Sequence, residues 1–146
     1  LDLWSPISTE GAPAPRALAC SAWIADLDAM LVVGGRGGEH TGAFYFPASN
    51  HWNAISIPDD ILLPAWCTST WTGNELVILW AEGGVMVGAR YLPETDLWLP
   101  IPRMPDSPAA REHFTLAWTN ETAMIWGGLG EDIRPLGTGY LLRIVH

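Results

Sequence analysis

Apolar residues in this chain gather in short runs, and Gly, Pro, Asn and Asp separate the runs. The longest runs, "AMLVV" and "LVILWA", have the length of strands and fall far short of the ~20 apolar residues that a membrane helix needs. β-branched and aromatic residues are common in the runs, and no segment longer than a turn shows the 3.6-residue period of a helix. The pattern therefore predicts an all-β chain of short strands joined by turns.

The runs recur with a period of about 47 residues. Three aromatic series repeat in the same order: Trp4, Trp52 and Trp98 are spaced by 48 and 46, Trp23, Trp71 and Trp118 by 48 and 47, and Tyr45, Tyr91 and Tyr140 by 46 and 49. Each unit contains up to four predicted strands, named a to d in chain order. They cover 18–23, 66–71 and 113–118 for a, 29–35, 76–82 and 123–128 for b, 42–46, 88–92 and 137–141 for c, and 51–57 and 97–101 for d.

The links between these segments predict antiparallel pairing. The a–b links are of hairpin length, and the c–d links "PASN" and "PETD" combine a Pro that presets φ with an Asn or Asp that bonds the local backbone. A four-stranded meander cannot bury both of its faces alone, and stacking copies around an axis solves that problem. We therefore expect a β-propeller with strand a innermost, and we expect the nine aromatic residues of the three series to pack between neighbouring blades.

These units resemble kelch repeats, which carry a Gly-Gly doublet at the end of strand b, a Tyr on c and a Trp about seven residues later. Gly34-Gly35, Tyr45 and Trp52 match this pattern in full. In the second unit Tyr91 and Trp98 match, but Ala81-Glu82 stand at the doublet position, and the "GG" just beyond is a candidate for a relocated turn.

The third unit shows Gly127-Gly128 and Tyr140 without a third Trp. The resemblance covers essentially the whole chain, and it implies a propeller of six or seven blades in the complete assembly.

The domain prediction is a single kelch-like unit over 1–146: an orphan outer strand in 1–10, blades in 11–57 and 58–103, and a blade in 104–146 that lacks its outer strand. "LDLW" at the start has the character of "TDLW" at 95–98. Two interpretations stay open: a second copy completes a six-bladed ring by strand exchange at the seam, or the chain is a fragment of a larger propeller. A monomeric three-bladed unit would expose large apolar faces, which argues against it.

Charge and cysteine content exclude some classes of partner and ligand. The net charge is −9 with seven Arg and no Lys, so no basic stripe exists for a nucleic acid, and no membrane insertion is expected. Cys20 and Cys67 fall inside apolar strands without metal-ligand spacing, and we interpret them as free buried thiols rather than as a disulfide. The first residue is Leu1, so the sequence leaves the compartment open between the cytoplasm and export.

Candidate binding residues come from loop length. Strand alternation places the d–a and b–c links on one face, and these are the long links, so binding is expected on that face and at the pore mouth. The candidates are Arg16, Arg36, His40, Trp66, Arg111 and His113. Arg16 and Arg111 stand seven residues before Trp23 and Trp118. They could clamp a carboxylate, but bracing of a loop through carbonyls is the favoured interpretation, and a structural hydrogen bond is favoured for His113.

The sequence contains no Walker loop, dinucleotide fingerprint, nucleophile elbow or H-E-x-x-H motif. No metal or cofactor is expected. We therefore expect a non-catalytic protein-binding or scaffolding module. The alternatives are an enzyme or a sugar- or carboxylate-binding propeller with an Arg-, His- and Trp-lined axial pocket, and a purely structural subunit that packs through its acidic surface.

Overall fold

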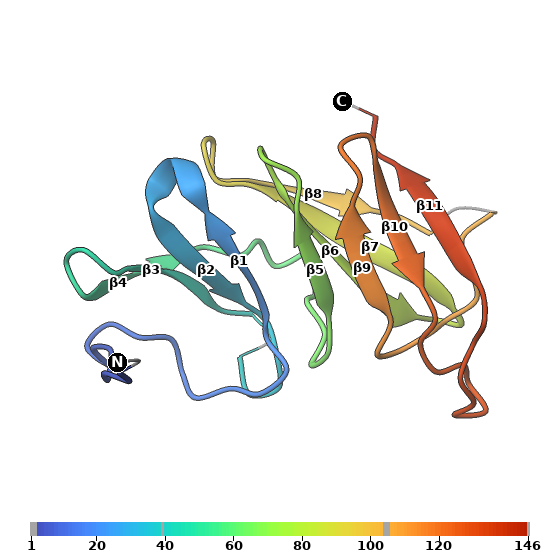
Figure 1. Ribbon diagram of the computed structural model, residues 1–146, viewed down its shortest axis with the longest axis horizontal. Helices are drawn as coiled ribbons and strands as arrows, with labels where there is room; N and C mark the ends of the chain where they lie inside the picture. Colours follow the sequence, from blue (N-terminus) through green and yellow to red (C-terminus); the bar gives the residue numbers. More distant parts are fainter. Residues whose placement is uncertain (1–2, 39, 104–105, 146) are drawn as a thin grey trace.

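The described residues, 3–38, 40–103 and 106–145 of the computed structural model, form eleven strands and one short 3₁₀ turn, so the all-β prediction is confirmed (Figure 1). The first sheet contains β1 (Cys20–Ile24), β2 (Ala29–Val33), β3 (Gly42–Phe46) and β4 (His51–Ile55). The second contains β5 (Thr68–Trp71), β6 (Leu76–Glu82), β7 (Val85–Leu92) and β8 (Leu97–Ile101), and the third contains β9 (Thr115–Trp118), β10 (Thr122–Trp126) and β11 (Gly139–Arg143). The 3₁₀ turn η1 (Ala25–Leu27) joins β1 to β2.

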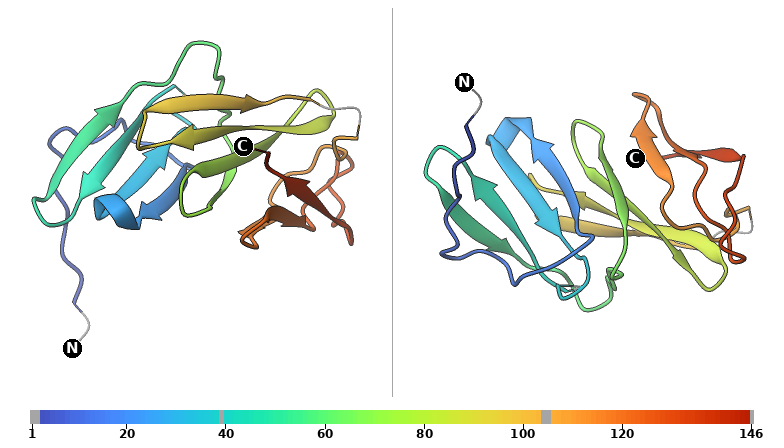
Figure 2. Two further views of the ribbon diagram at one scale, coloured as in Figure 1. Left: turned by 90° about the horizontal axis from the view of Figure 1, so that it is seen from above. Right: turned by 60° about the horizontal axis from the view of Figure 1, so that its bottom comes forward.

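Each sheet is an antiparallel meander in chain order, as the link lengths predicted. The third sheet has the order β11-β10-β9, and within the described ranges no strand pairs with the other edge of β11. None of the three sheets closes on itself in the described part of the chain. Residues 3–9, which belong to the predicted orphan strand, form no regular secondary structure, and the N-terminal end of this segment runs out from the sheets (Figure 2).

The second sheet lies between the other two and is buried on both faces. On β6, Leu76 and Ile78 pack in a cluster with the first sheet, whereas Val77 and Leu79 pack in a cluster with the third. Successive side chains of a strand point to opposite faces, which explains why the "LVIL" run is apolar throughout. The inner strands also meet, because β1 contacts β5 and β5 contacts β9, and the three lie in a row (Figure 1).

Cys20 and Cys67 form a disulfide, so the prediction of free thiols was wrong. They are 47 residues apart, and their Cα atoms lie 5.8 Å from each other, within the usual range for a disulfide. The physical reason is the contact between β1 and β5, which brings together residues that are one period apart in the sequence.

The register of the strands shows that Tyr140 is out of step with the other two tyrosines. Across the first sheet, one row of paired residues runs in the order Trp23, Met30, Tyr45 and Trp52. The second sheet repeats this row as Trp71, Leu76, Tyr91 and Trp98. In the third sheet the row is Trp118, Ala123 and Leu142, whereas Tyr140 pairs with Ile125. Leu142 therefore holds the position of Tyr45 and Tyr91, and Tyr140 lies two residues earlier on the strand.

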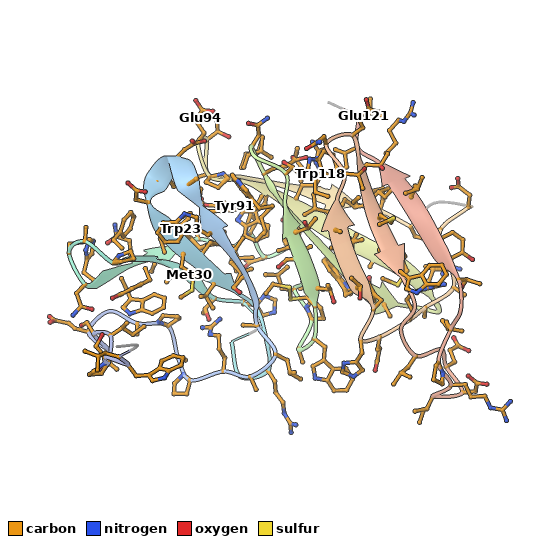
Figure 3. All side chains as sticks on the ribbon, in the orientation of Figure 1. Trp23, Met30, Tyr91, Glu94, Trp118 and Glu121 are labelled. Carbon is orange, nitrogen blue, oxygen red and sulfur yellow. A yellow bond between two sulfur atoms is a disulfide. The ribbon has the colours of Figure 1, made fainter. Side chains whose placement is uncertain are left out.

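The nine aromatic residues expected between blades have several environments. Trp71, Tyr91 and Trp98 pack between the first and second sheets, and Trp118 packs between the second and third. Tyr45 and Trp52 lie on the far face of the first sheet, with ring centroids 5.0 Å apart. Trp4 and Trp23 are exposed, and so in part is Tyr140. Figure 3 shows Trp23 beside Met30 on the uncovered face of the first sheet.

Candidate functional site

A cavity of about 390 Å³ lies where the three inner strands begin. All three sheets contribute to its wall: Leu18 and Ala19 from the first, Pro64 to Thr68 with Leu79, Trp80 and Ala81 from the second, and Arg111 to Phe114 from the third. The long d–a loops end here and the b–c loops lie at the same end of the strands, whereas Glu94 and Glu121 mark the hairpin turns at the opposite end (Figure 3). The cavity therefore lies on the face where the sequence predicted binding.

Three equivalent positions converge on this cavity. Leu18, Trp66 and His113 each stand two residues before an inner strand, and all three side chains are exposed at its wall. The rings of Trp66 and His113 stack with their centroids 6.4 Å apart and an interplanar angle of 28°.

Leu18 and His113 both adopt a left-handed backbone conformation, with φ of 59° and 54°. This conformation is uncommon for residues other than glycine, and it is kept only where the surroundings enforce it. In both sheets the enforcing contact is a pair of backbone bonds just before this residue, between Ala17 and Arg36 and between Glu112 and Leu129. The turn into strand a is thus held in the same way in the first and third sheets.

Arg16 and Arg111 are committed to bracing their own b–c loops. One terminal nitrogen of Arg16 donates to the carbonyls of Gly34 at 2.9 Å and Thr41 at 2.9 Å, and the other donates to the Thr41 hydroxyl at 2.8 Å. Arg111 makes the same set of bonds to Gly127 at 3.0 Å and to the carbonyl of Thr138 at 2.9 Å.

Arg111 is also 3% exposed, and its guanidinium lies 5.0 Å from the centre of the Tyr140 ring. Both arginines thus brace their loops, the favoured one of the two roles weighed from the sequence. Neither terminal nitrogen pair is left to clamp a ligand bidentately.

The second sheet needs no such brace because its b–c link is only a tight turn. Gly83 and Gly84 join β6 directly to β7 with φ of 55° and 82°, so the doublet has moved two residues beyond Ala81-Glu82. Pro64 takes the place of the arginine and lines the cavity instead. The structure confirms the relocated turn that "GGVM" suggested.

The remaining candidates lie elsewhere on the loop face. Arg36 is exposed and bonds Ala17 through its backbone, and His40 is exposed on the same loop. Neither residue lines the cavity, and nor does Arg16. The six sequence candidates therefore separate into Trp66, His113 and Arg111 at the cavity and Arg16, Arg36 and His40 away from it.

Sequence reasoning missed Leu18, Trp80 and Phe114. Leu18 was accessible from the repeat, since it lies 48 residues before Trp66 just as Trp66 lies 47 before His113. Phe114 was accessible in the same way, since it lies 47 residues after Cys67 and Cys67 lies 48 after Ala19. Trp80 carries no such signal. Trp80 lies in a continuous apolar run, where the sequence gives no indication that one end of the strand faces a cavity.

The chemistry of the wall is suited to contact with an apolar group. It is mostly apolar and aromatic, with His113, Glu112 and Thr68 as its polar groups besides the committed Arg111, and the Cys67 sulfur is in a disulfide. Within the described ranges no group of three or more His, Cys, Asp or Glu side chains could hold a metal ion. Ligand pockets are commonly concave and apolar with a few placed polar groups.

Comparison with protein-family models and with curated proteins gives no match for this chain. Among the described residues no helix has the length and apolar character needed to cross a membrane.

Proposed function

We propose that this chain supplies three consecutive blades of a kelch-like β-propeller and acts as a non-catalytic module that binds a protein partner at the cavity between its inner strands. The propeller arrangement is supported by three meanders that pack face to face, by inner strands that contact one another in series, and by a Gly doublet at the end of each strand b. Because no family model matches the chain, the resemblance to kelch repeats is based on the repeated residues.

The observation that carries the binding role is the convergence of Leu18, Trp66 and His113. Three equivalent positions on a rigid scaffold present exposed side chains to one hollow, and one of them is a Trp. Exposed aromatic residues in a concave apolar site are typical anchors of protein interfaces. An apolar side chain from a loop or extended segment of the partner suits such a wall.

Binding is favoured over catalysis because the groups that could act chemically are committed or isolated. Arg111 is held by carbonyls, and His113 stacks on Trp66. A second candidate is carbohydrate binding, because the exposed Trp66 ring offers a flat apolar surface for a sugar ring. The bound arginines argue against the carboxylate-clamping form of that alternative.

The test is a selection of peptides from a random display library on the immobilised chain, run in parallel with a glycan array. We expect peptides rich in apolar residues, whose affinity falls at least about tenfold on Trp66→Ala, as for a typical interface anchor. Leu62→Ala is the matched control, because Leu62 is an exposed apolar residue on the same d–a loop but lies outside the cavity wall.

Glycans whose binding depends on Trp66, with no such peptides, would replace the protein-binding proposal by the carbohydrate one. Binding of either class that Trp66→Ala leaves unchanged would remove the cavity from consideration.

A further inference from the structure

A hydrogen bond between consecutive repeats occurs twice in this chain. The indole of Trp98 donates to the carbonyl of Ser56 at 3.1 Å, and the indole of Trp52 donates to the carbonyl of Ser8 at 2.8 Å. Ser56 stands four residues after Trp52, and Ser8 stands four residues after Trp4. Each strand-d Trp is thus bonded to the segment that follows the preceding Trp of the same series.

The same rule identifies Pro102, four residues after Trp98, as the third acceptor. Pro102 lines a hollow of about 310 Å³ between the second and third sheets, together with Ile101 and Leu142. Leu142 holds the position of Tyr91, whose ring lies 4.6 Å from that of Trp98 in the second sheet. The hollow is therefore the place where a third strand-d Trp would lie, and within the described ranges the adjacent edge of β11 has no paired strand.

We propose that this hollow receives Trp4 of a second copy of the chain, with residues 3–8 of that copy added to the edge of β11 and the Trp4 indole donating to the Pro102 carbonyl. The inference rests on the blade arrangement in the proposed function. Trp4 is fully exposed, and Leu3-Trp4 repeats the Leu97-Trp98 pair that opens β8. Ser8 of the second copy would keep its bond to Trp52 of that copy, so the exchanged segment stays tied to its own first sheet.

The exposed faces of the two terminal sheets support the same partner independently. On the third sheet Met124, Trp126 and Leu141 point away from the second sheet and are 42%, 58% and 67% exposed. Their equivalents on the first sheet are Leu31, Val33 and Phe44, which the second sheet covers, and Leu31 and Val33 are 0% exposed.

Within the chain, the face that carries Leu31, Val33 and Phe44 is covered by the opposite face of the next sheet. The first sheet leaves that opposite face partly uncovered, with Trp23 50% exposed beside the half-buried Met30 and Val32. Because the two uncovered faces correspond to the two sides of interfaces already present in the chain, the first sheet of a second copy fits the third sheet. Two such contacts close a six-bladed ring, since a head-to-tail interface closes when the rotation fits.

The experiment is sedimentation or light scattering of the 146-residue chain over a concentration series. We expect the mass of two chains, and Trp4→Ala is expected to weaken association by roughly 30-fold or more, as for an anchor Trp in a pocket. Leu141→Glu is a second variant that should weaken the same dimer from the opposing surface. Both side chains are exposed in the single chain, so neither change is expected to unfold it. Trp66→Ala, at the cavity, is the control and should keep the dimer.

A peptide of residues 1–10 should bind the Trp4→Ala chain, and the same peptide with Ala at position 4 should not. A mass of one chain at tens of micromolar would overturn the proposal. This holds even if the peptide binds, because a segment other than that of a second copy would then fill the edge of β11. A dimer that is unchanged in Trp4→Ala would overturn it as well. Neither result bears on the cavity proposal, which depends on Trp66 and not on association.

Discussion

Two tyrosine hydroxyls make the same hydrogen bond in successive repeats. Tyr45 donates to the side-chain oxygen of Asn50 at 2.8 Å, and Tyr91 donates to a carboxylate oxygen of Asp96 at 2.9 Å. Asn50 and Asp96 both have φ of 50° in the c–d turn, a conformation that Asn and Asp tolerate better than most residues. A single short polar residue therefore shapes the turn and holds the ring of the packed Tyr.

The difference between the two pairs leads to a prediction about pH. Burial of the ring, followed by its hydrogen bond to the Asp96 carboxylate, raises the pKa of Tyr91 well above its ordinary value. The unfolded chain loses this proton near pH 10, whereas the folded chain retains it, so the free energy of unfolding should fall as the pH rises above about 10. Asp96→Asn removes the charge and keeps an acceptor, as in Asn50. We expect it to lower the Tyr91 pKa and to make that fall shallower.

Phenolate absorbance during an alkaline titration would measure the Tyr91 step, and Tyr91→Phe would assign it. Urea unfolding at pH about 9 and about 11 would measure the free energy on either side of the ordinary tyrosine pKa. If Asp96→Asn does not change the titration curve, the Asp96 carboxylate does not contribute to the raised pKa of Tyr91.

At the scale of the element, the glycine doublets serve two different purposes. The second glycine has φ of 84° in Gly35, 82° in Gly84 and 91° in Gly128. A Cβ on Gly35 would lie 2.7 Å from the Ala17 carbonyl oxygen, and on Gly128 it would lie 2.6 Å from that of Glu112. At Gly84 the nearest atom would be 3.6 Å away, at the end of the flexible Glu131 side chain. Only the first and third doublets thus allow the b–c loop to cross the start of strand a.

This difference provides a matched pair of substitutions. Gly84→Ala should cost about 1–2 kcal/mol, because its only penalty is a left-handed alanine. Gly35→Ala should cost about 1–3 kcal/mol more, because it also forces the Ala17 backbone away from its bonds to Arg36. The free energies of unfolding in urea would give both values. Equal costs would mean that the close approach at Ala17 relaxes without penalty.

Periodicity and turn chemistry predicted all eleven described strands, most of them within two residues of their bounds. They also predicted the face that carries the cavity. Trp66 and His113, which line it, were among the candidates because Trp66 lies near Pro64, the position equivalent to the two arginines, and His113 stands at the start of an inner strand. Spacing alone failed at Tyr140. The interval of 49 residues after Tyr91 hid a shift of two along the strand, which only the pairing of Leu142 with Ala123 reveals.

The disulfide was beyond sequence reasoning for a similar reason. Cys20 and Cys67 stand one period apart but at unequal offsets from Trp23 and Trp71, so the repeat does not place them directly opposite each other. Their contact depends on how β1 and β5 lie across the gap between two sheets. The uncovered apolar faces and the hollow beside β11 likewise need the faces of the strands to be known and cannot be read from residue types.

At the scale of the whole molecule, the sheets differ in how firmly they are held. The second sheet is packed on both faces, whereas the first sheet packs on the rest of the chain mainly through the face toward the second. The Cys20–Cys67 link closes a loop that contains all four strands of the first sheet and ties it to the second. The cross-link therefore ties a terminal sheet, which has one packed neighbour, to the sheet that is packed on both faces.

Removal of this link should lower the stability of the molecule substantially. The loop-entropy model gives about 4 kcal/mol for a closed loop of 47 residues, and native disulfides of this kind typically contribute about 2–4 kcal/mol. We expect the Cys20→Ser, Cys67→Ser double variant to lose this amount in urea unfolding. A reductant should lower the wild-type chain to the stability of the variant and leave the variant unchanged.

If hydrogen exchange is followed in the same samples, the amides of β2 and β3 should lose more protection than those of β10, because only the first sheet lies within the loop. A wild-type chain whose unfolding is insensitive to reductant would show that packing against the second sheet suffices to hold the first.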